Sequence, residues 1–335
     1  MTKKILIVTD NLPDQINGVV TTYKNIEPYA IRDGYTIDYI NPGRYRTINC
    51  PGYSEVKLAW APPWKVGKEI KKIDPTYIHI ATEGPVGMSA RRYLAVRRLR
   101  YNSAYHTKFP EGIKALLGIP EAVTWPVVRW FHSNSNAVLT TTKSMVEQLQ
   151  SHGFKDNVKP WTRGVDRELF KPKDRKTHCG KPLLVCVSRV SKEKNLEAFF
   201  EMHYPGATKM MVGDGPMLDA YKKQYPDVHF VGAKRGQELA DFYQQADVFV
   251  FPSRWDTFGL VMIEAMACGT PVAAYPVQGP VDVIDEGATG CMHEDLATAT
   301  KLALDLDRDQ VYNTSMKWSW ERAWEIFRDN LVEVK

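Results

Sequence analysis

The chain has 335 residues, a length that suits two domains of about 150 residues each. Hydrophobic residues make up 44% and charged residues 25%, which is an ordinary globular composition. The formal net charge of +5 is too small to indicate a nucleic-acid partner, and no nucleic-acid motif is present.

The cysteines and the apolar runs indicate the cellular compartment of the protein. Five cysteines are scattered along the chain without a CxxC or metal-ligand spacing, which favours a reducing cytoplasm. The first apolar run turns polar after Val8, too early for a signal peptide. No run of about 18 apolar residues occurs elsewhere. These features predict a soluble cytoplasmic protein, or one that lies peripherally on the inner face of a membrane.

The first half of the chain alternates between strands and helices. An apolar run at residues 3–9 predicts a buried strand, and Asn17-Gly18 leads into a helix at 19–32. Further strands are predicted at residues 35–40, 75–81, 103–107 and 137–141. Alternating strands and helices are typical of a parallel, doubly wound sheet.

The same alternation restarts in the second half. Strands are predicted at 182–188, 208–212, 228–231, 248–251 and 271–275, and helices at 195–202, 217–224, 237–245 and 260–268. Residues 167–181, rich in Lys, Pro and Asp, are interpreted as the interdomain linker. Residues 315–331 form an amphipathic tryptophan-rich helix. We therefore expect two α/β domains with a cleft between them, with ligands at the carboxyl ends of the strands.

The loop after strand 248–251 carries the strongest candidate site. Gly259 opens a helix, and backbone N–H groups at a helix start suit a diphosphate. Glu264 follows five residues later, where its carboxylate can accept two hydrogen bonds from the vicinal hydroxyls of a ribose. By itself, the pattern also fits a plain strand–loop–helix in which Asp256 or Thr257 caps the helix.

Three weaker signals lie at other strand ends. Arg189 and Lys194 place two cations beside a helix start, as a diphosphate leaving group requires, although a solvated basic loop would look the same. Gly18 allows close approach of a ligand to the backbone, although a plain turn is the default. His106 ends the strand at 103–107, where a lone histidine is more often a core residue.

Together these motifs resemble glycosyltransferase family 4, a family of retaining enzymes with the GT-B fold. The run Asp256-Thr257-Phe258-Gly259, then Glu264 and residues 265–272, resembles the family's nucleotide-sugar signature, in which two glutamates flank seven residues. Here Asp256 replaces the first glutamate. Smaller matches occur at residues 163–166, 213–216 and 230–232, so the resemblance spans residues 5 to about 331.

The resemblance assigns roles to individual residues. The expected catalytic residues are His106, Arg189, Lys194 and Asp256. His106 is expected to orient the reacting sugar and not to act as a nucleophile. The expected donor-binding residues are Gly18, Val19, Ser188, Gly213, Gly232, Thr257, Phe258, Gly259, Leu260 and Glu264. The expected acceptor-binding residues are Asn17, Thr82, Glu83 and Gly84.

The resemblance also implies a fold and a mechanism. Two doubly wound Rossmann-like domains would face a cleft: residues 1–170 would bind the acceptor and residues 171–314 the donor. The helix in residues 315–335 would cross back to the first domain. The leaving diphosphate would take the acceptor proton in a front-face attack, with domain closure assembling the site. No metal or other cofactor is expected, because the nucleotide sugar, linked to UDP or GDP, is a substrate.

The acceptor is predicted from the first domain. Residues 64–72, 91–100 and 116–131 combine basic charge with apolar or aromatic residues, as anionic membrane interfaces require, although helices that merely cover the sheet would show the same pattern. The whole-chain pattern looks closest to bacterial lipid-directed hexosyltransferases. We therefore expect transfer of a hexose or hexuronate to a lipid such as diacylglycerol, in glycolipid biosynthesis. The alternatives are a soluble oligosaccharide or polysaccharide acceptor, a nucleotide-sugar epimerase, and an inactive nucleotide-sugar binder.

Overall fold

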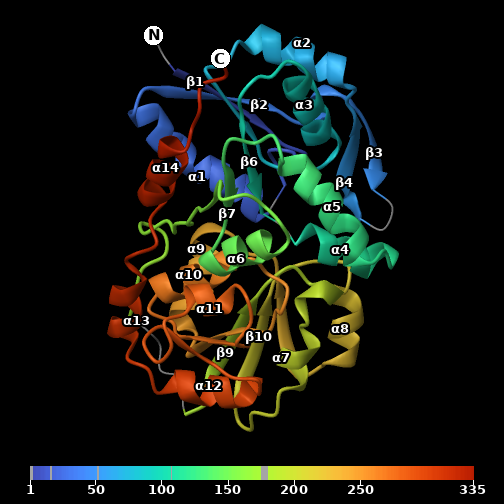
Figure 1. Ribbon diagram of the computed structural model, residues 1–335. Coiled ribbons are helices and arrows are strands. Elements are labelled where there is room, and N and C mark those ends of the chain that lie inside the picture. The colour runs from blue at the N-terminus through green and yellow to red at the C-terminus, as the bar shows by residue number, and fades with distance from the viewer. Residues whose placement is uncertain (1–2, 16, 51–52, 107, 175–179) are drawn as a thin grey trace. The chain divides into compact units, whose positions relative to one another are not determined.

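The computed structural model describes residues 3–15, 17–50, 53–106, 108–174 and 180–335 (Figure 1). The chain divides into two compact units. The first unit comprises residues 1–163 and 320–335, and the second comprises residues 164–319.

The first unit is built on a six-stranded parallel sheet with the order β2-β1-β5-β6-β7-β8. Its strands are β1 (Lys3–Val8), β2 (Tyr35–Ile40), β5 (Tyr77–Ile80), β6 (Asn102–Tyr105), β7 (Val138–Thr140) and β8 (Val158–Pro160). The side chains at 5–8 in β1 are fully buried, as expected for a strand covered on both faces. The strand order runs in opposite directions from β1, so the predicted doubly wound sheet is confirmed; residue 107, predicted to end β6, lies outside the described residues.

Helices of the first unit connect and cover these strands. They are α1 (Gly18–Arg32), α2 (Pro63–Ile73), α3 (Pro85–Val96), α4 (Phe109–Leu117), α5 (Glu121–His132), α6 (Lys143–Ser151) and α14 (Trp320–Asp329), with the 3-10 turn η1 (Pro42–Arg44). An antiparallel hairpin of β3 (Arg46–Cys50) and β4 (Tyr53–Trp60), absent from the sequence prediction, precedes α2.

The C-terminal helix α14 packs against α1, as predicted (Figure 1). The indole of Trp324 donates a hydrogen bond to Asp33 Oδ2 at 2.8 Å, and Arg328 Nη1 donates to the same oxygen at 3.0 Å. The indole of Trp161, just after β8, donates to the Ala323 carbonyl at 2.8 Å. These bonds fix the end of the chain to the first unit.

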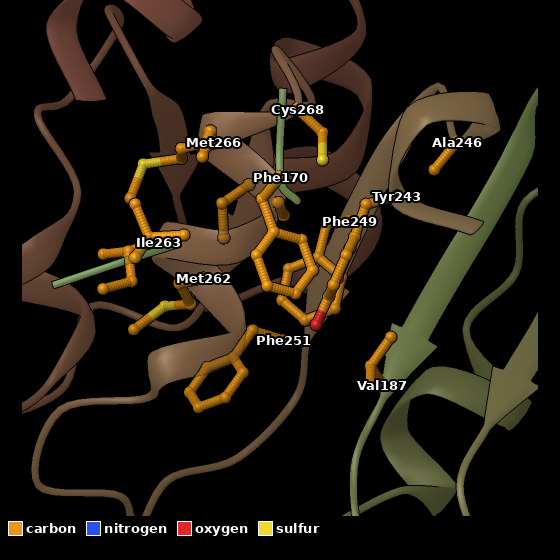
Figure 2. Packing of buried hydrophobic residues seen from close by; sticks show 14 of the residues in the cluster. Phe170, Val187, Tyr243, Ala246, Phe249, Phe251, Met262, Ile263, Met266 and Cys268 are labelled. Carbon is orange, nitrogen blue, oxygen red and sulfur yellow. The ribbon is translucent and has the colours of Figure 1, made fainter. Parts of the chain in front are cut away.

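The second unit repeats the design with the strand order β11-β10-β9-β12-β13-β14, again all parallel. Its strands are β9 (Leu183–Val187), β10 (Thr208–Val212), β11 (Val228–Gly232), β12 (Val248–Phe251), β13 (Val272–Ala274) and β14 (Gly290–Met292). Its helices are η2 (Lys192–Lys194), α7 (Glu197–Glu201), α8 (Leu218–Gln224), α9 (Gly236–Gln245), α10 (Leu260–Ala267), α11 (Pro280–Val283), α12 (Leu296–Leu304) and α13 (Arg308–Ser315). The apolar face of α10 lies in the core with Phe249 and Phe251 of β12 (Figure 2).

The boundaries between the units differ from those predicted at 170/171 and 314/315. Val165 and Phe170 are buried in the second unit's core, where the Phe170 ring lies 5.9 Å from that of Tyr243 (Figure 2). Trp318 packs edge-to-face on Phe258, also in the second unit. Apolar side chains before and within the predicted linker, and before α14, therefore extend the second unit to residues 164–319. Residues 175–179 of the predicted linker lie outside the described residues.

Candidate active site

The predicted residues of the second unit meet at the carboxyl edge of its parallel sheet. Ser188, Gly213 and Gly232 end or follow β9, β10 and β11, which are neighbours in the sheet. Gly213 N donates to the Gly232 carbonyl at 2.9 Å. A Cβ atom on Gly213 would lie only 1.8 Å from the Ser188 carbonyl oxygen, so this close approach of two backbones requires glycine. Ser188, Gly213 and Gly232 therefore form one continuous backbone surface beside the loop that follows β12.

Two of the predicted catalytic residues form an ion pair. Lys194 Nζ lies 2.7 Å from Asp256 Oδ1, and each side chain is about one quarter exposed, at 25% and 24%. The neighbouring Asn195 adopts a left-handed backbone (φ 53°) and donates from its side chain to the Pro252 carbonyl at 3.0 Å. The loops after β9 and β12 are thereby tied together. A partly exposed ion pair contributes only about 0–1 kcal/mol, so a polar ligand could replace it at little cost.

The start of α10 presents backbone N–H groups at the same edge. Gly259 precedes the helix with φ +83°, and a Cβ there would lie 2.8 Å from the Met262 side chain. Phe258 is buried against Trp318, with ring centroids 5.3 Å apart, so only its backbone remains for a ligand. Thr257 and Leu260 are half-buried on either side. Backbone N–H groups at a helix start are suited to a diphosphate.

Glu264 lies one turn further along α10 and is held by a tyrosine. Glu264 Oε2 accepts a hydrogen bond from the Tyr243 hydroxyl at 2.9 Å. Burial raises the pKa of Glu264 to about 7, and the hydrogen bond from Tyr243 opposes this rise. Tyr243 comes from α9 and carries no motif, so sequence reasoning did not include it. A carboxylate with a pKa near neutrality is typical of a functional site.

Two further residues, Arg189 and Gly279, belong to the loops at this edge of the second sheet. Arg189 is half-buried directly after Ser188. Gly279, which the sequence analysis did not select, has φ +99°, and a Cβ on it would lie 2.6 Å from the Asp256 carbonyl oxygen. The segment before α11 thus supports the backbone that carries Asp256.

At the start of α1, Asn17 acts as the helix cap. Asn17 Oδ1 accepts from Val20 N at 2.9 Å, and Asn17 Nδ2 donates to Asn11 Oδ1 at 3.0 Å. Gly18, the first residue of the helix, is exposed, and Val19 is half-buried. The Asn17 side chain is therefore engaged by the protein itself, which is what an N-cap asparagine does.

The segment Thr82-Glu83-Gly84 follows β5 and packs on a buried carboxylate. Thr82 Oγ1 donates to Asp10 Oδ2 at 2.8 Å, and Asp10 Oδ1 accepts from Val86 N at 2.7 Å at the start of α3. Burial raises the pKa of Asp10 to about 6, against the opposing effect of these hydrogen bonds. A Cβ on Gly84 would lie 2.4 Å from the Asp10 carboxyl carbon. Asp10 thus organises this segment, a role that the sequence analysis did not predict.

Glu83 is held by a histidine and not by solvent. Its carboxylate oxygen Oε1 lies 3.3 Å from His132 Nε2, and the two side chains are 8% and 1% exposed. His132 Nδ1 lies 2.7 Å from the hydroxyl of Ser103 in β6. The structure therefore places Glu83 in a buried polar network of the first unit.

His106 follows β6 and has protein partners at both ring nitrogens. Nε2 lies 3.1 Å from the Tyr23 hydroxyl and Nδ1 lies 2.8 Å from Arg163 Nη2. Burial, and then the positive charge of Arg163, lowers the pKa of His106 well below its usual value. The ring is therefore neutral at physiological pH. The roles assigned to His106 and to the other selected residues stay predictions.

Known proteins share this arrangement along most of the chain. Residues 16–169 match the family model described as Glycosyltransferase Family 4, and residues 181–306 match the model described as Glycosyl transferases group 1. Sulfoquinovosyl transferase SQD2 from Arabidopsis thaliana is 30% identical over 85% of this chain and 62% of its own length. This chain thus spans less than two thirds of the plant relative.

Two bacterial relatives are matched over more of their length. The GDP-mannose-dependent alpha-mannosyltransferase of Corynebacterium glutamicum is 25% identical over 98% of this chain and 88% of its own. The alpha-monoglucosyldiacylglycerol synthase of Streptococcus pneumoniae is 23% identical over 98% of this chain and 86% of its own.

Solved structures share the fold. Sucrose-phosphate synthase from Thermosynechococcus elongatus superposes with a TM-score of 0.76 at 19% identity, covering 98% of both chains. Anabaena HepE, solved with UDP and glucose, superposes with a TM-score of 0.71 at 14% identity, covering 98% of both chains.

The two six-stranded parallel sheets form the GT-B fold. The family models and the named relatives support a hexosyltransferase. The chain belongs to glycosyltransferase family 4.

Proposed function

We propose that the protein is a retaining transferase that moves a hexose or hexuronate from a UDP- or GDP-sugar to a hydroxyl of a lipid acceptor such as diacylglycerol. The observation that carries the proposal is the carboxyl edge of the second sheet. There the Lys194–Asp256 pair, the glycine start of α10 and the near-neutral carboxylate of Glu264 follow neighbouring strands.

Each part of this edge suits one part of a nucleotide sugar. Glu264 would accept hydrogen bonds from the ribose hydroxyls, and the N–H groups after Gly259 would bind the diphosphate. Asp256 would bind hydroxyls of the sugar once Lys194 turns from it toward the leaving phosphate. HepE, which shares the fold, has been solved with UDP-glucose, and this supports the choice of ligand class.

The proposed chemistry needs positioning and charge stabilisation, and no covalent nucleophile. The bond from the sugar to the diphosphate breaks, and the acceptor hydroxyl bonds to the same face of the sugar. Its proton passes to the departing phosphate oxygen. Arg189, Lys194 and the helix start would stabilise the negative charge that develops on the diphosphate. We propose that this transfer is independent of metal ions.

A basic hollow in the first unit supports a membrane-bound acceptor. The hollow, of about 930 Å³, lies between η1, the β3–β4 hairpin and α2. It is lined by Gly43, Arg44, Tyr45, Arg46, Trp60, Lys65, Lys68 and Glu69. Glu69 pairs with Arg44 at 3.0 Å. Within the described residues, Arg46, Lys65 and Lys68 have no carboxylate at ion-pair distance.

Exposed tryptophans flank the basic hollow. Trp60 is 61% exposed and Trp64 is 69% exposed. Lys65 Nζ lies 4.6 Å from the centroid of the Trp60 ring. Aromatic side chains beside cations suit an interface with anionic lipids. In the described part of the chain, every helix is too short or too polar to span a membrane. The relative from Streptococcus pneumoniae, which is named for a glucosyldiacylglycerol product, supports a lipid acceptor of this kind.

The other two segments predicted to face a membrane, residues 91–100 and 116–131, contain both buried and exposed side chains. Arg91 of α3 is buried and donates to the carbonyl oxygens of Phe131 and Trp130, at 3.1 and 2.8 Å. It therefore holds α3 to α5 and is withdrawn from any membrane. On α5, Val123 and Val127 are exposed. Four arginines after Arg91 are exposed as well: Arg92, Arg97, Arg98 and Arg100. Residues 92–100 and α5 therefore remain candidate surfaces beside the basic hollow.

The decisive experiment offers UDP- and GDP-hexoses together with two kinds of acceptor. One is diacylglycerol in vesicles that contain phosphatidylglycerol, and the other is a set of soluble oligosaccharides. The proposal predicts glycolipid product, detected by mass spectrometry, only with vesicles. Glycosylation of soluble oligosaccharides without lipid would contradict the lipid acceptor and favour the alternative acceptor class.

Paired variants test the basic hollow itself. Replacing Lys65 and Lys68 with serine should weaken binding to phosphatidylglycerol vesicles, measured by sedimentation, by about thirtyfold, since each lysine near an anionic surface contributes about 1 kcal/mol. Replacing Lys71 and Lys72 removes the same charge from the same helix, outside the hollow. Equal weakening in both pairs would contradict a specific surface.

A further inference from the structure

Four polar side chains from four elements form one chain of hydrogen bonds inside the first unit. Tyr23 of α1 lies with its hydroxyl 2.8 Å from His79 Nε2 in β5 and 3.1 Å from His106 Nε2 after β6. Arg163, after β8, lies with Nη2 2.8 Å from His106 Nδ1. Tyr23, His79 and Arg163 are 3%, 0% and 3% exposed. His106 itself is half-buried, so the hydrogen-bonded series runs from a closed interior to a partly exposed ring.

The guanidinium of Arg163 determines which atom donates and which accepts in each hydrogen bond of this series. A guanidinium has only donors, so His106 Nδ1 must accept, and the proton of the neutral ring must reside on Nε2. Nε2 then donates to the Tyr23 hydroxyl oxygen, and that hydroxyl donates to His79 Nε2. The reverse direction between Tyr23 and His79 would leave the tyrosine proton without an acceptor in this series, because both histidine Nε2 atoms would then carry protons. His79 Nδ1 has no partner among the described residues in either direction, so it does not distinguish the two.

Arg163 is a buried cation whose contacts are all with neutral groups. Its Nη1 donates to the carbonyl oxygens of Trp161 and Thr162, at 2.7 and 3.0 Å. Its guanidinium lies over the Trp161 ring at 4.5 Å. Among the described residues, no carboxylate forms an ion pair with it. Burial lowers the pKa of Arg163 to about 10, so the charge persists at physiological pH.

Aromatic rings pack against the two histidines of this hydrogen-bonded series. The rings of Trp161 and Phe327 contact His79, and Trp161 also contacts His106. The other titratable groups that act electrostatically on His106 or Tyr23 are His132, Glu83 and Tyr39. A second proton on His106 would have to sit on Nδ1, facing the N–H of Arg163 and its positive charge. The geometry therefore opposes protonation of His106 by both sterics and charge.

We propose that Arg163, Tyr23 and His79 are positioning residues that hold His106 as a neutral imidazole with its proton on Nε2. The ring is thereby an anchor that fixes the end of β6, and it neither accepts nor delivers a proton during turnover. The consequence for catalysis rests on the proposed function, whereas the state of the ring does not.

The state of the ring is tested directly by nitrogen NMR. The protein carries eight histidines, so selective ¹⁵N labelling of histidine suffices, with the His106 signals identified by their loss in His106→Gln. We expect Nδ1 to give the shift of an unprotonated nitrogen and Nε2 that of a protonated one, unchanged between pH 5.5 and 8.5. A protonated Nδ1, or titration of the ring within this range, would overturn the proposal whatever acceptor the enzyme uses.

Kinetics of matched variants test the positioning role. Arg163→Met should lower kcat by about 10²-fold, the loss typical of a misplaced reacting group, and leave the Kd of the nucleotide sugar unchanged. It should also allow the His106 ring to titrate. Arg163→Lys, which retains one donor and the charge, should restore part of kcat and the neutral ring.

Arg91→Met is the control, because Arg91 is also buried, donates to carbonyl oxygens and stacks on a tryptophan at 3.7 Å. It should leave kcat within a few-fold of wild type. Equal losses in both variants would reduce Arg163 to a structural residue and overturn the inference. If Arg163→Met fails to fold, Tyr23→Phe removes only the oxygen between the histidines, and unchanged kcat together with unchanged ring shifts would contradict the proposal.

Discussion

Glu264→Gln separates the charge of the proposed ribose ligand from its shape. Glu264 accepts a hydrogen bond from Tyr243, and burial raises its pKa to about 7. The ionised carboxylate can accept from two ribose hydroxyls at once, whereas the protonated acid turns one oxygen into a donor. Binding of the nucleotide sugar should therefore weaken as the pH falls through the pKa of Glu264.

The pKa sets the size of the effect. Roughly one molecule in eleven is ionised at pH 6, against about ten in eleven at pH 8, so Kd should rise about tenfold over this range, or about 1.4 kcal/mol. A nucleotide sugar suits the measurement because its diphosphate is esterified at both ends and does not titrate there. Glu264→Gln should bind about tenfold more weakly at pH 8 and show no dependence on pH.

The same substitution should have the opposite effect on stability. The pKa of Glu264 is raised above its usual 4.5, so its contribution to stability is complete below pH 4.5 and is lost as the pH rises through 7. At pH 8 the ionised group costs at most about 3 kcal/mol in the empty enzyme. Glu264→Gln should therefore melt higher than wild type at pH 8, and the difference in stability should shrink to below about 1 kcal/mol at pH 5.

Calorimetric titration at pH 6, 7 and 8 and thermal melts at pH 5 and 8 measure both effects. Glu201→Gln is the matched control, because Glu201 also accepts from a tyrosine, Tyr225, at 2.6 Å, but on the surface. That variant should change neither quantity. A wild-type Kd that does not vary with pH, or full affinity in Glu264→Gln at pH 8, would refute the assignment of Glu264 to the ribose.

Three further predictions concern the same edge of the second sheet. Asp256→Asn should abolish transfer, whereas Asp256→Glu should keep nucleotide-sugar binding and change the preferred sugar; initial rates across a panel of sugars test this, and activity of the asparagine variant near wild type would count against it. Gly213→Ala should lower the melting temperature because its Cβ would strike the Ser188 carbonyl at 1.8 Å. Gly206→Ala, also at positive φ but in open space, should cost only about 1–2 kcal/mol, and equal melting of the two would contradict the close-approach argument. Transfer should continue undiminished in EDTA, and a loss that Mg²⁺ restores would refute metal independence.

Strands buried on both faces could be predicted from the sequence. Each is an uninterrupted apolar run bounded by polar or turn residues: β12 lies where residues 248–251 predict it, and β9 lies within the predicted range 182–188. The β3–β4 hairpin was missed because it is an antiparallel ribbon outside both main sheets, and its described side chains include exposed polar ones. The helix predicted from residue 315 begins at Trp320, since residues 308–315 form α13 with Asp307 as its cap.

Part of the candidate site could likewise be predicted from the sequence, and part could not. Loops that follow parallel strands converge by geometry, so the loops after β9 and β12 could be selected from order along the chain. The roles of Ser188, Gly213 and Asp256 were assigned by the family resemblance. Partners such as Tyr243 for Glu264, or Arg163 for His106, come from other elements at separations of 21 and 57 residues. No periodicity connects such pairs, and only the packing of helices on the sheet brings them together.

The stereochemistry of the product tests the central claim most directly. Wild-type enzyme is incubated with the preferred nucleotide sugar and diacylglycerol vesicles, and the anomeric configuration of the glycolipid is read by proton NMR before any rearrangement. A retaining transferase should yield the anomeric configuration of the donor. Inverted product, or free sugar released without glycolipid, would contradict the proposed function.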